Sequence, residues 1–229
     1  MQKTETSVLL LSKFKKKYLF WGLKQLAFKR FFMKEVKGLL FFKILGSGRN
    51  AGFRVSPSFL HQGFFCHFES EKDAENFIFS NEIVNDYKTR SEDFFLTKLQ
   101  SYSCKGSWSG NIMKEVVRKP LSGPIASLTR ASIKVSKAIE FWSLAPETEI
   151  SLNKSKGCIL SVGLGEAPLL RQATFSIWEN SKYLDLFARQ GSHLDAIKVA
   201  YKKNYFSESM FIRFKTTSME GSWKGVSFD

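Results

Sequence analysis

The pentapeptide Gly106-Ser107-Trp108-Ser109-Gly110 returns 115 residues later as Gly221-Ser222-Trp223-Lys224-Gly225. Other segments also match in the same order: Lys37-Gly38 with Lys156-Gly157, Leu45-Gly46 with Leu164-Gly165, and 62–77 with 172–187. Ordered matches whose spacing changes slightly are typical of a duplication with insertions in loops. We therefore predict two similar halves in one chain.

Hydrophobic periodicity predicts the same order of elements in each half: strand, helix, strand, strand, helix, strand. In the first half we expect these elements at 8–12, 18–34, 39–45, 63–68, 71–88 and 94–101. In the second half we expect them at 125–133, 136–142, 158–164, 173–178, 181–203 and 210–216. This order is the ferredoxin-like split βαβ. The predicted fold is α+β, with halves at 1–110 and 124–229 joined by a linker at 111–123. Together they form the barrel that dimeric α/β-barrel proteins build from two subunits.

The composition excludes disorder, because 43% of the 229 residues are hydrophobic and 15% are aromatic. The net charge of +14 is local, since residues 1–56 hold 13 Lys and Arg against Glu5 and Glu35. No nucleic-acid reader motif accompanies that charge, so we expect no nucleic-acid partner. The three scattered cysteines favour a reducing cytoplasm. We expect neither a signal peptide nor a membrane-spanning segment.

One helix differs between the halves. In the second half His193, Ala196, Ile197, Ala200 and Tyr201 fall on one predicted inward stripe, where the first half has Ile83 in the place of the histidine. An imidazole there suits a metal ligand or a general base. A core histidine bonded to a carbonyl is the alternative, and the two small alanines leave room for a flat group.

Other chemistry-bearing patterns are weak. The chain has no HExxH, GxSxG or Walker loop, and the glycine-rich segment 46–50 lacks the residues that follow in phosphate-binding loops. We expect His61 to be solvated in its loop and His67 to alternate along a strand. We expect Trp178 to lie in the core.

Several stretches resemble the spheroidene monooxygenase family over nearly the full chain. The most specific run is Gly163-Leu-Gly165-Glu166-Ala167-Pro168-Leu-Leu-Arg171-Gln172-Ala-Thr-Phe-Ser. The other matching stretches are 45–53, 106–108, 128–133, 141–142, 193–197, 205–214 and 221–223.

The resemblance implies a haem-dependent 2-ketolase that uses O₂ on an acyclic carotenoid and takes electrons from a donor. It makes His193 the expected ligand of the iron in haem b, with Ala196, Ile197 and Ala200 as cofactor-binding neighbours. Arg171, Gln172 and Thr174 are the candidates on the opposite side of the haem. Because Arg171 and Gln172 alternate along a strand, they cannot both face it. Arg49 and Arg130 are further candidates for that side of the haem. For Glu166, a structural role as a loop cap is the alternative to a role in the site.

Residues 13–34 combine lysines with Phe, Tyr and Trp, which suits docking on an anionic membrane surface. A lysine face over an ordinary aromatic core is the alternative. We expect a cytoplasmic protein, peripheral on the inner face of the membrane if this segment docks, and the residues also allow a homo-oligomer. Two other functions stay open: a cofactor-free or ligand-binding barrel with His193 as base or core residue, and a basic surface-binding module.

Overall fold

The computed structural model describes residues 4–28, 33, 35–167, 169–189 and 191–228, without the side chains of 191–193. The first half contains β1 (Thr6–Phe14), η1 (Lys16–Tyr18), α1 (Leu19–Phe28), β2 (Leu39–Gly48), η3 (Arg49–Ala51), β3 (Pro57–Phe68), α2 (Glu71–Ser80), α3 (Glu82–Arg90) and β4 (Ser91–Gly106). The second half contains β5 (Ile125–Ile133), η4 (Val135–Lys137), α4 (Ala138–Asn153), β6 (Cys158–Ala167), β7 (Arg171–Trp178), α5 (Ser181–Arg189), α6 (Gly191–Lys202), β8 (Phe206–Trp223) and β9 (Val226–Phe228).

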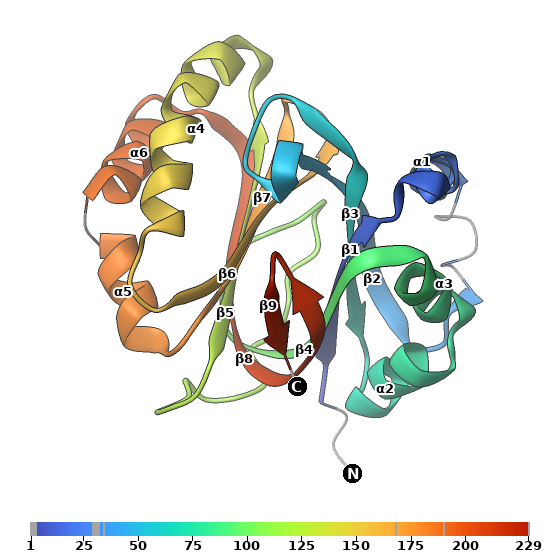
Figure 1. The fold of residues 1–229 in the computed structure, drawn as a ribbon. Helices are drawn as coiled ribbons and strands as arrows, with labels where there is room; N and C mark the ends of the chain where they lie inside the picture. The colour runs from blue at the N-terminus through green and yellow to red at the C-terminus, as the bar shows by residue number, and fades with distance from the viewer. Residues whose placement is uncertain (1–3, 29–32, 34, 168, 190, 229) are drawn as a thin grey trace.

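The strands form one antiparallel barrel. Their order is β4-β1-β3-β2-β6-β7-β5-β8-β9, and a further β4–β8 pairing closes eight of them into a ring. The halves meet at two seams, β2 with β6 and β4 with β8. The helices of each half cover its own side of the barrel, α1 to α3 on one side and α4 to α6 on the other (Figure 1). The predicted fold, two ferredoxin-like halves that form an α/β barrel, is confirmed.

Strand β1 shows why this sequence needs layers on both faces. Its residues Thr6–Leu11 are all buried, because successive side chains point to opposite faces of the sheet. Leu9 and Leu11 enter the barrel interior with side chains from both halves. Val8 and Leu10 pack in a second core with residues of α2 and α3.

The two Gly-Ser-Trp turns are structurally equivalent. Gly106 and Gly221 have φ of +83° and +92°, where a side chain is strained. A Cβ on Gly106 would lie 2.0 Å from Ser209 O, and one on Gly221 would lie 2.1 Å from Phe94 O. Each turn therefore packs against the first residues of the long strand from the opposite half.

The helices depart from their predicted bounds for local reasons. The segment predicted as one helix at 71–88 forms two helices, because α2 ends before Asn81 and the Asn81 side-chain oxygen accepts a hydrogen bond from the Ile83 N–H in the first turn of α3. The helix predicted at 136–142 continues to Asn153. The helix predicted at 18–34 is described as α1 to Phe28, and residues 29–32 and 34 lie outside the described residues.

Candidate active site

A cavity separates the helices of the second half from the barrel. It has a polar compartment of about 360 Å³ and an apolar compartment of about 120 Å³. The two compartments share Phe53, Thr129, Thr148, Thr174, Ile197 and Phe211. Helices α4, α5 and α6 stand over this face of the sheet, on the left in Figure 1. The combined space is in the range of small-molecule and cofactor sites.

The cavity floor consists of two rows of residues that run across five strands. The first row, from β4 to β6, is Ser103, Arg213, Ser127, Ser176 and Ser161. The second row is Lys105, Phe211, Thr129, Thr174 and Gly163. Neighbours in a row are partners across the ladder, so their side chains point to the same face. The floor is therefore rich in hydroxyl groups.

The first half fills the equivalent space with apolar side chains. Counted from the matching ends of the ladders, Ser127–Ser176 corresponds to the pair Val8–Cys66. In the next row, Thr129–Thr174 corresponds to the pair Leu10–Phe64. All four of these first-half side chains are buried in the core beneath α2 and α3. Small hydroxyl residues in place of Leu and Phe leave the second half with a cavity where the first half has a core.

Helix α6 supplies part of the cavity wall. Ala196, Ile197 and Ala200 line the apolar compartment, as does Tyr201, which is 61% exposed. The predicted cofactor-binding residues Ala196, Ile197 and Ala200 therefore lie together at the cavity. His193 belongs to α6, three residues before Ala196, and its side chain lies outside the described residues.

Strand β7 divides the three predicted catalytic residues. Gln172 lines the apolar compartment and Thr174 lines both compartments. The Gln172 side-chain amide donates a hydrogen bond to Ala167 O at 3.3 Å. Arg171 alternates with them along the strand, is exposed and does not line either compartment. Gln172 and Thr174 therefore lie on the face of β7 that lines the cavity, and Arg171 lies on the other face.

The first half contributes an aromatic side chain to this cavity. Phe53, which follows η3, stacks on Trp142 of α4 with ring centroids 5.1 Å apart. Its backbone N–H also donates a hydrogen bond to the Glu149 carboxylate at 3.1 Å. The loop comes this close because Gly163 has no side chain: a Cβ there would lie 2.5 Å from Gly52 O. One half thus covers part of the other half's site.

Comparison with known proteins supplies the family. No family model matches the chain. A spheroidene monooxygenase of Rubrivivax gelatinosus is 45% identical over 188 residues, which cover 82% of this chain and 73% of that protein. The chain belongs to the spheroidene monooxygenase family. A second member, from Rhodobacter capsulatus, is 31% identical over 209 residues, 90% of this chain and 87% of its own. The protein is therefore an oxygenase.

Solved structures agree on the fold of this spheroidene monooxygenase family member. An aldoxime dehydratase superposes with a TM-score of 0.61 at 9% identity, over 94% of this chain and 82% of its own. A second aldoxime dehydratase, crystallised with butyraldoxime, gives a TM-score of 0.60 at 6% identity, over 94% of this chain and 80% of its own. At such low identity the likeness concerns the fold alone.

Some residues of the stretches that resemble the spheroidene monooxygenase family form a buried ion network away from the cavity. Arg130, whose side chain is 2% exposed, pairs with Glu208 and, at 3.2 Å, with Glu166. Glu166 also accepts hydrogen bonds from Lys43 at 2.8 Å and from the Trp108 indole at 2.6 Å. Two cations thus meet two carboxylates beside the first Gly-Ser-Trp turn.

Both carboxylates stay ionised in this network. Burial alone would raise the pKa of Glu208, but hydrogen bonds from Gly110 and Ser107 and the charge of Arg130 lower it to about 2. Burial likewise opposes ionisation of Glu166, and its bonds to Lys43 and Trp108 lower its pKa below the usual range. The network fastens the turn to the barrel. Glu166 therefore does more than cap a loop, and Arg130 lies in a structural contact.

The remaining sequence candidates lie outside the cavity. His67 is buried between Ser7 and Glu5, with ring nitrogens 2.9 Å and 3.1 Å from their side-chain oxygens. The prediction that His61 is solvated is wrong. His61 is half-buried near Trp223, and burial lowers its pKa to about 4. Arg49 is exposed in η3, and Trp178 is buried as predicted.

Proposed function

We propose that this oxygenase binds haem b in the cavity and oxidises a lipophilic polyene, a carotenoid, at C-2 to a ketone. The observation that carries the proposal is the cavity itself, which the second half opens by replacing a packed core with hydroxyl residues. The names of the spheroidene monooxygenases that the chain matches support the substrate class.

The cavity residues fit a haem. The alanines at 196 and 200 give α6 a low surface beside the sheet, so a flat group has room between them. His193 precedes these alanines at helical spacing and is the one histidine of α6. We propose that His193 binds the iron and that Ala196, Ile197 and Ala200 contact the macrocycle. The bound haem would supply O₂ activation.

The chain's own residues then have distinct tasks. Phe141 of α4 and Phe206 and Phe211 of β8, on the walls of the apolar compartment other than α6, contact the polyene end beside the macrocycle and exclude water. Thr174 of the floor and Gln172, two residues before it on β7, donate hydrogen bonds to the reacting oxygen. Each of two oxygenations consumes one O₂, two electrons and two protons and releases one water. The resulting gem-diol loses a further water to give the ketone, and a separate donor supplies the electrons.

Absorption spectroscopy of protein produced with adequate haem tests the proposal. We expect a Soret band that His193→Ala weakens, while Lys198→Ala, on the exposed side of the same helix, leaves it unchanged. Normal haem binding by His193→Ala would refute the ligand assignment. Product formation without haem would instead support the cofactor-free barrel with His193 as base.

We also propose that the protein docks on an anionic membrane surface through residues 13–34 and the edge of the molecule that the β2–β3 connection and the first turns of α4 continue. Within the described part of this segment, Phe14, Tyr18 and Trp21 pack in the core, while Phe20 and Phe28 are 81% and 56% exposed. Lys24 lies between them on the outward stripe of α1.

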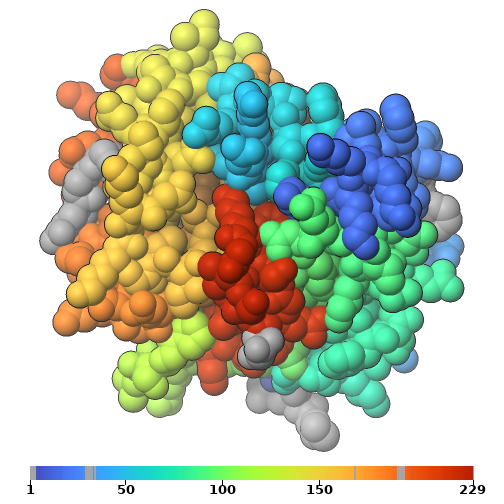
Figure 2. Space-filling model, in the orientation of Figure 1, coloured from blue at the N-terminus to red at the C-terminus, as the bar shows by residue number. Residues whose placement is uncertain are grey.

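Two other segments continue this edge. Helix α1, the β2–β3 connection and the first turns of α4 lie along one side of the molecule (Figure 2). The β2–β3 connection adds Val55, which is 54% exposed, and α4 adds Ile139, which is 91% exposed. Exposed apolar side chains among lysines suit the headgroup region of an anionic bilayer. In the part of the chain that the structure describes, no helix is long and apolar enough to cross a membrane.

Vesicle sedimentation tests this docking. We expect salt-sensitive binding to vesicles rich in phosphatidylglycerol and weaker binding to phosphatidylcholine alone, since each lysine contributes about 1 kcal/mol near such a surface. Phe20→Ser should weaken binding, and Phe79→Ser is the control because Phe79 is 78% exposed on α2, away from this edge. Equal loss with both variants, or binding that ignores salt, would reject the proposal.

A further inference from the structure

The polar compartment has a basic end. Lys105 of β4, Arg189 of α5 and Arg213 of β8 all line it. Arg213 pairs across the ladder with Ser103, two residues before Lys105, so Arg213 and Lys105 are diagonal neighbours on one face of the sheet. Arg189 lies one helical turn after Asp185 on α5, and Asp185 accepts a hydrogen bond from Arg213. Three cations from three elements therefore meet at one end of the cavity.

Little negative charge balances this end. Asp185 accepts a hydrogen bond from Arg213 at 2.6 Å and another from Lys119 at 3.0 Å, so two cations already share this carboxylate. Burial opposes ionisation of Asp185, yet these two bonds lower its pKa below the usual range. Among the residues that the structure describes, Lys105 and Arg189 form no ion pair. Lys105 and Arg189 are exposed, so the basic end carries excess positive charge at the solvent-facing rim of the cavity.

The apolar compartment of the cavity does not favour anions. The apolar compartment is lined by aromatic and aliphatic side chains, which cannot compensate a buried charge. Glu149, the acidic residue among those that line the polar compartment, is engaged by Arg54 and the Phe53 N–H. A ligand with carboxylates at one end and an apolar body would therefore enter in one orientation.

We propose that Lys105, Arg189 and Arg213 bind the carboxylates of the cavity's cofactor, the two propionate groups of haem. This inference rests on the proposed function. It assigns the carboxylates as the ligand of the basic end. The cofactor then has one orientation, because its carboxylates lie at the basic end and its macrocycle lies against the apolar compartment. Arg213 shares its charge with Asp185, whereas Lys105 and Arg189 are free to pair with a ligand.

Equilibrium binding of two porphyrins tests the inference without any activity measurement. Haem-free protein is titrated with haem and with haem dimethyl ester, whose carboxylates are uncharged, and binding is followed by Soret absorbance and quenching of tryptophan fluorescence. We expect haem to bind about a hundredfold more tightly than the ester, as one charged hydrogen bond to each of the two propionates predicts. High salt should weaken the binding of haem and leave the ester unaffected.

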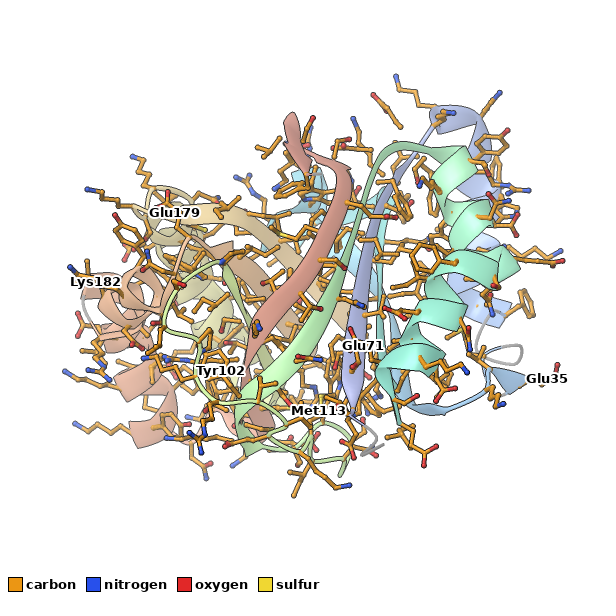
Figure 3. All side chains as sticks on the ribbon, turned by 90° about the horizontal axis from the view of Figure 1, so that it is seen from below. Glu35, Glu71, Tyr102, Met113, Glu179 and Lys182 are labelled. Atoms are coloured by element: carbon orange, nitrogen blue, oxygen red, sulfur yellow. The ribbon has the colours of Figure 1, made fainter. Side chains whose placement is uncertain are left out.

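Substitutions test whether Lys105 and Arg189 cause the preference for haem over its ester. Lys105→Met should lower haem affinity about tenfold and leave ester affinity unchanged. Arg189→Gln is the second variant, and neither change breaks an ion pair within the described residues. The matched control is Lys182→Met, because Lys182 lies on α5 at the outer surface of the molecule (Figure 3).

The outcomes separate this inference from the proposed function. Equal affinity of the native protein for haem and its ester would overturn the carboxylate assignment while haem binding stands. A haem preference that survives both Lys105→Met and Arg189→Gln would overturn it as well. Binding of neither porphyrin would overturn the proposed function, and this inference with it.

Discussion

Replacing Glu208 by Gln should loosen the first Gly-Ser-Trp turn in a way that depends on pH. The Glu208 carboxylate accepts hydrogen bonds from the Ser107 hydroxyl and the Gly110 N–H, both at 2.9 Å, and it pairs with Arg130. Glu208→Gln keeps the shape of the side chain and removes its charge. The variant therefore isolates the contribution of ionisation at this site.

The magnitude follows from the pKa of Glu208. A carboxyl whose pKa falls from 4.5 to about 2 on folding is stabilised by about 3 kcal/mol at neutral pH. The side chain is 25% exposed, so solvent screening reduces this to about 2 kcal/mol. Because the folded pKa lies below the unfolded one, the contribution is complete above pH 4.5 and is lost as the pH falls through 2.

Urea unfolding monitored by tryptophan fluorescence provides the assay. At pH 7 we expect Glu208→Gln to lower the free energy of unfolding by about 2 kcal/mol, and at about pH 3 the difference from the native protein should be less than half of that. Glu147→Gln, at an exposed position of α4, should cost little at either pH. A deficit of the same size at both pH values would refute the reasoning, because lost packing rather than lost charge would then explain it.

Three further predictions concern other parts of the molecule. Gly106→Ala should destabilise the protein by about 2 kcal/mol or more, measured as a lower unfolding midpoint, because its Cβ would lie 2.0 Å from Ser209 O at a φ of +83°. Gly110→Ala, with φ of +76° and open space around it, should cost about 1 kcal/mol. Burial raises the pKa of the Cys66 thiol, so this fully buried group should react with a thiol reagent only as fast as the protein unfolds. An NMR titration of His61 should give a midpoint near pH 4, and its neutral state should make the protein lose stability as the pH falls from 6.5 towards 4.

The sequence predicts the strands well because the hydrophobic pattern that indicates each strand lies within the strand itself. The range 125–133 coincides with β5, and the other predicted strands lie inside the observed ones. The helices are less predictable, since a single Asn81 side chain divides one of them. The predicted repeat directs attention to α6 of the second half, where four residues of the predicted inward stripe, Ala196, Ile197, Ala200 and Tyr201, line the cavity.

The ion network and the basic end of the cavity cannot be predicted from any single stretch of sequence. The ion network joins Arg130 to residues 36 and 78 positions away, so only the closed barrel brings these charges together. The hydroxyl floor is visible in the sequence once the halves are aligned, because Ser127 and Thr129 stand where the first half has Val8 and Leu10. The cations of the basic end come from three separate elements, and no single stretch indicates them.

The β4–β8 seam has a consequence for how the chain folds. Thr97 and Ser218 are joined by a hydrogen bond although they are 121 residues apart, and the strands between them close the ring. Ring closure therefore waits for nearly the whole polypeptide to leave the ribosome, and such distant pairings form slowly. Until then, β4 keeps an unpaired edge and Leu9, Leu11 and Phe95 lack part of their surroundings. A chain cut within 111–123 should yield fragments that are poorly soluble alone and that recover the barrel only when refolded together.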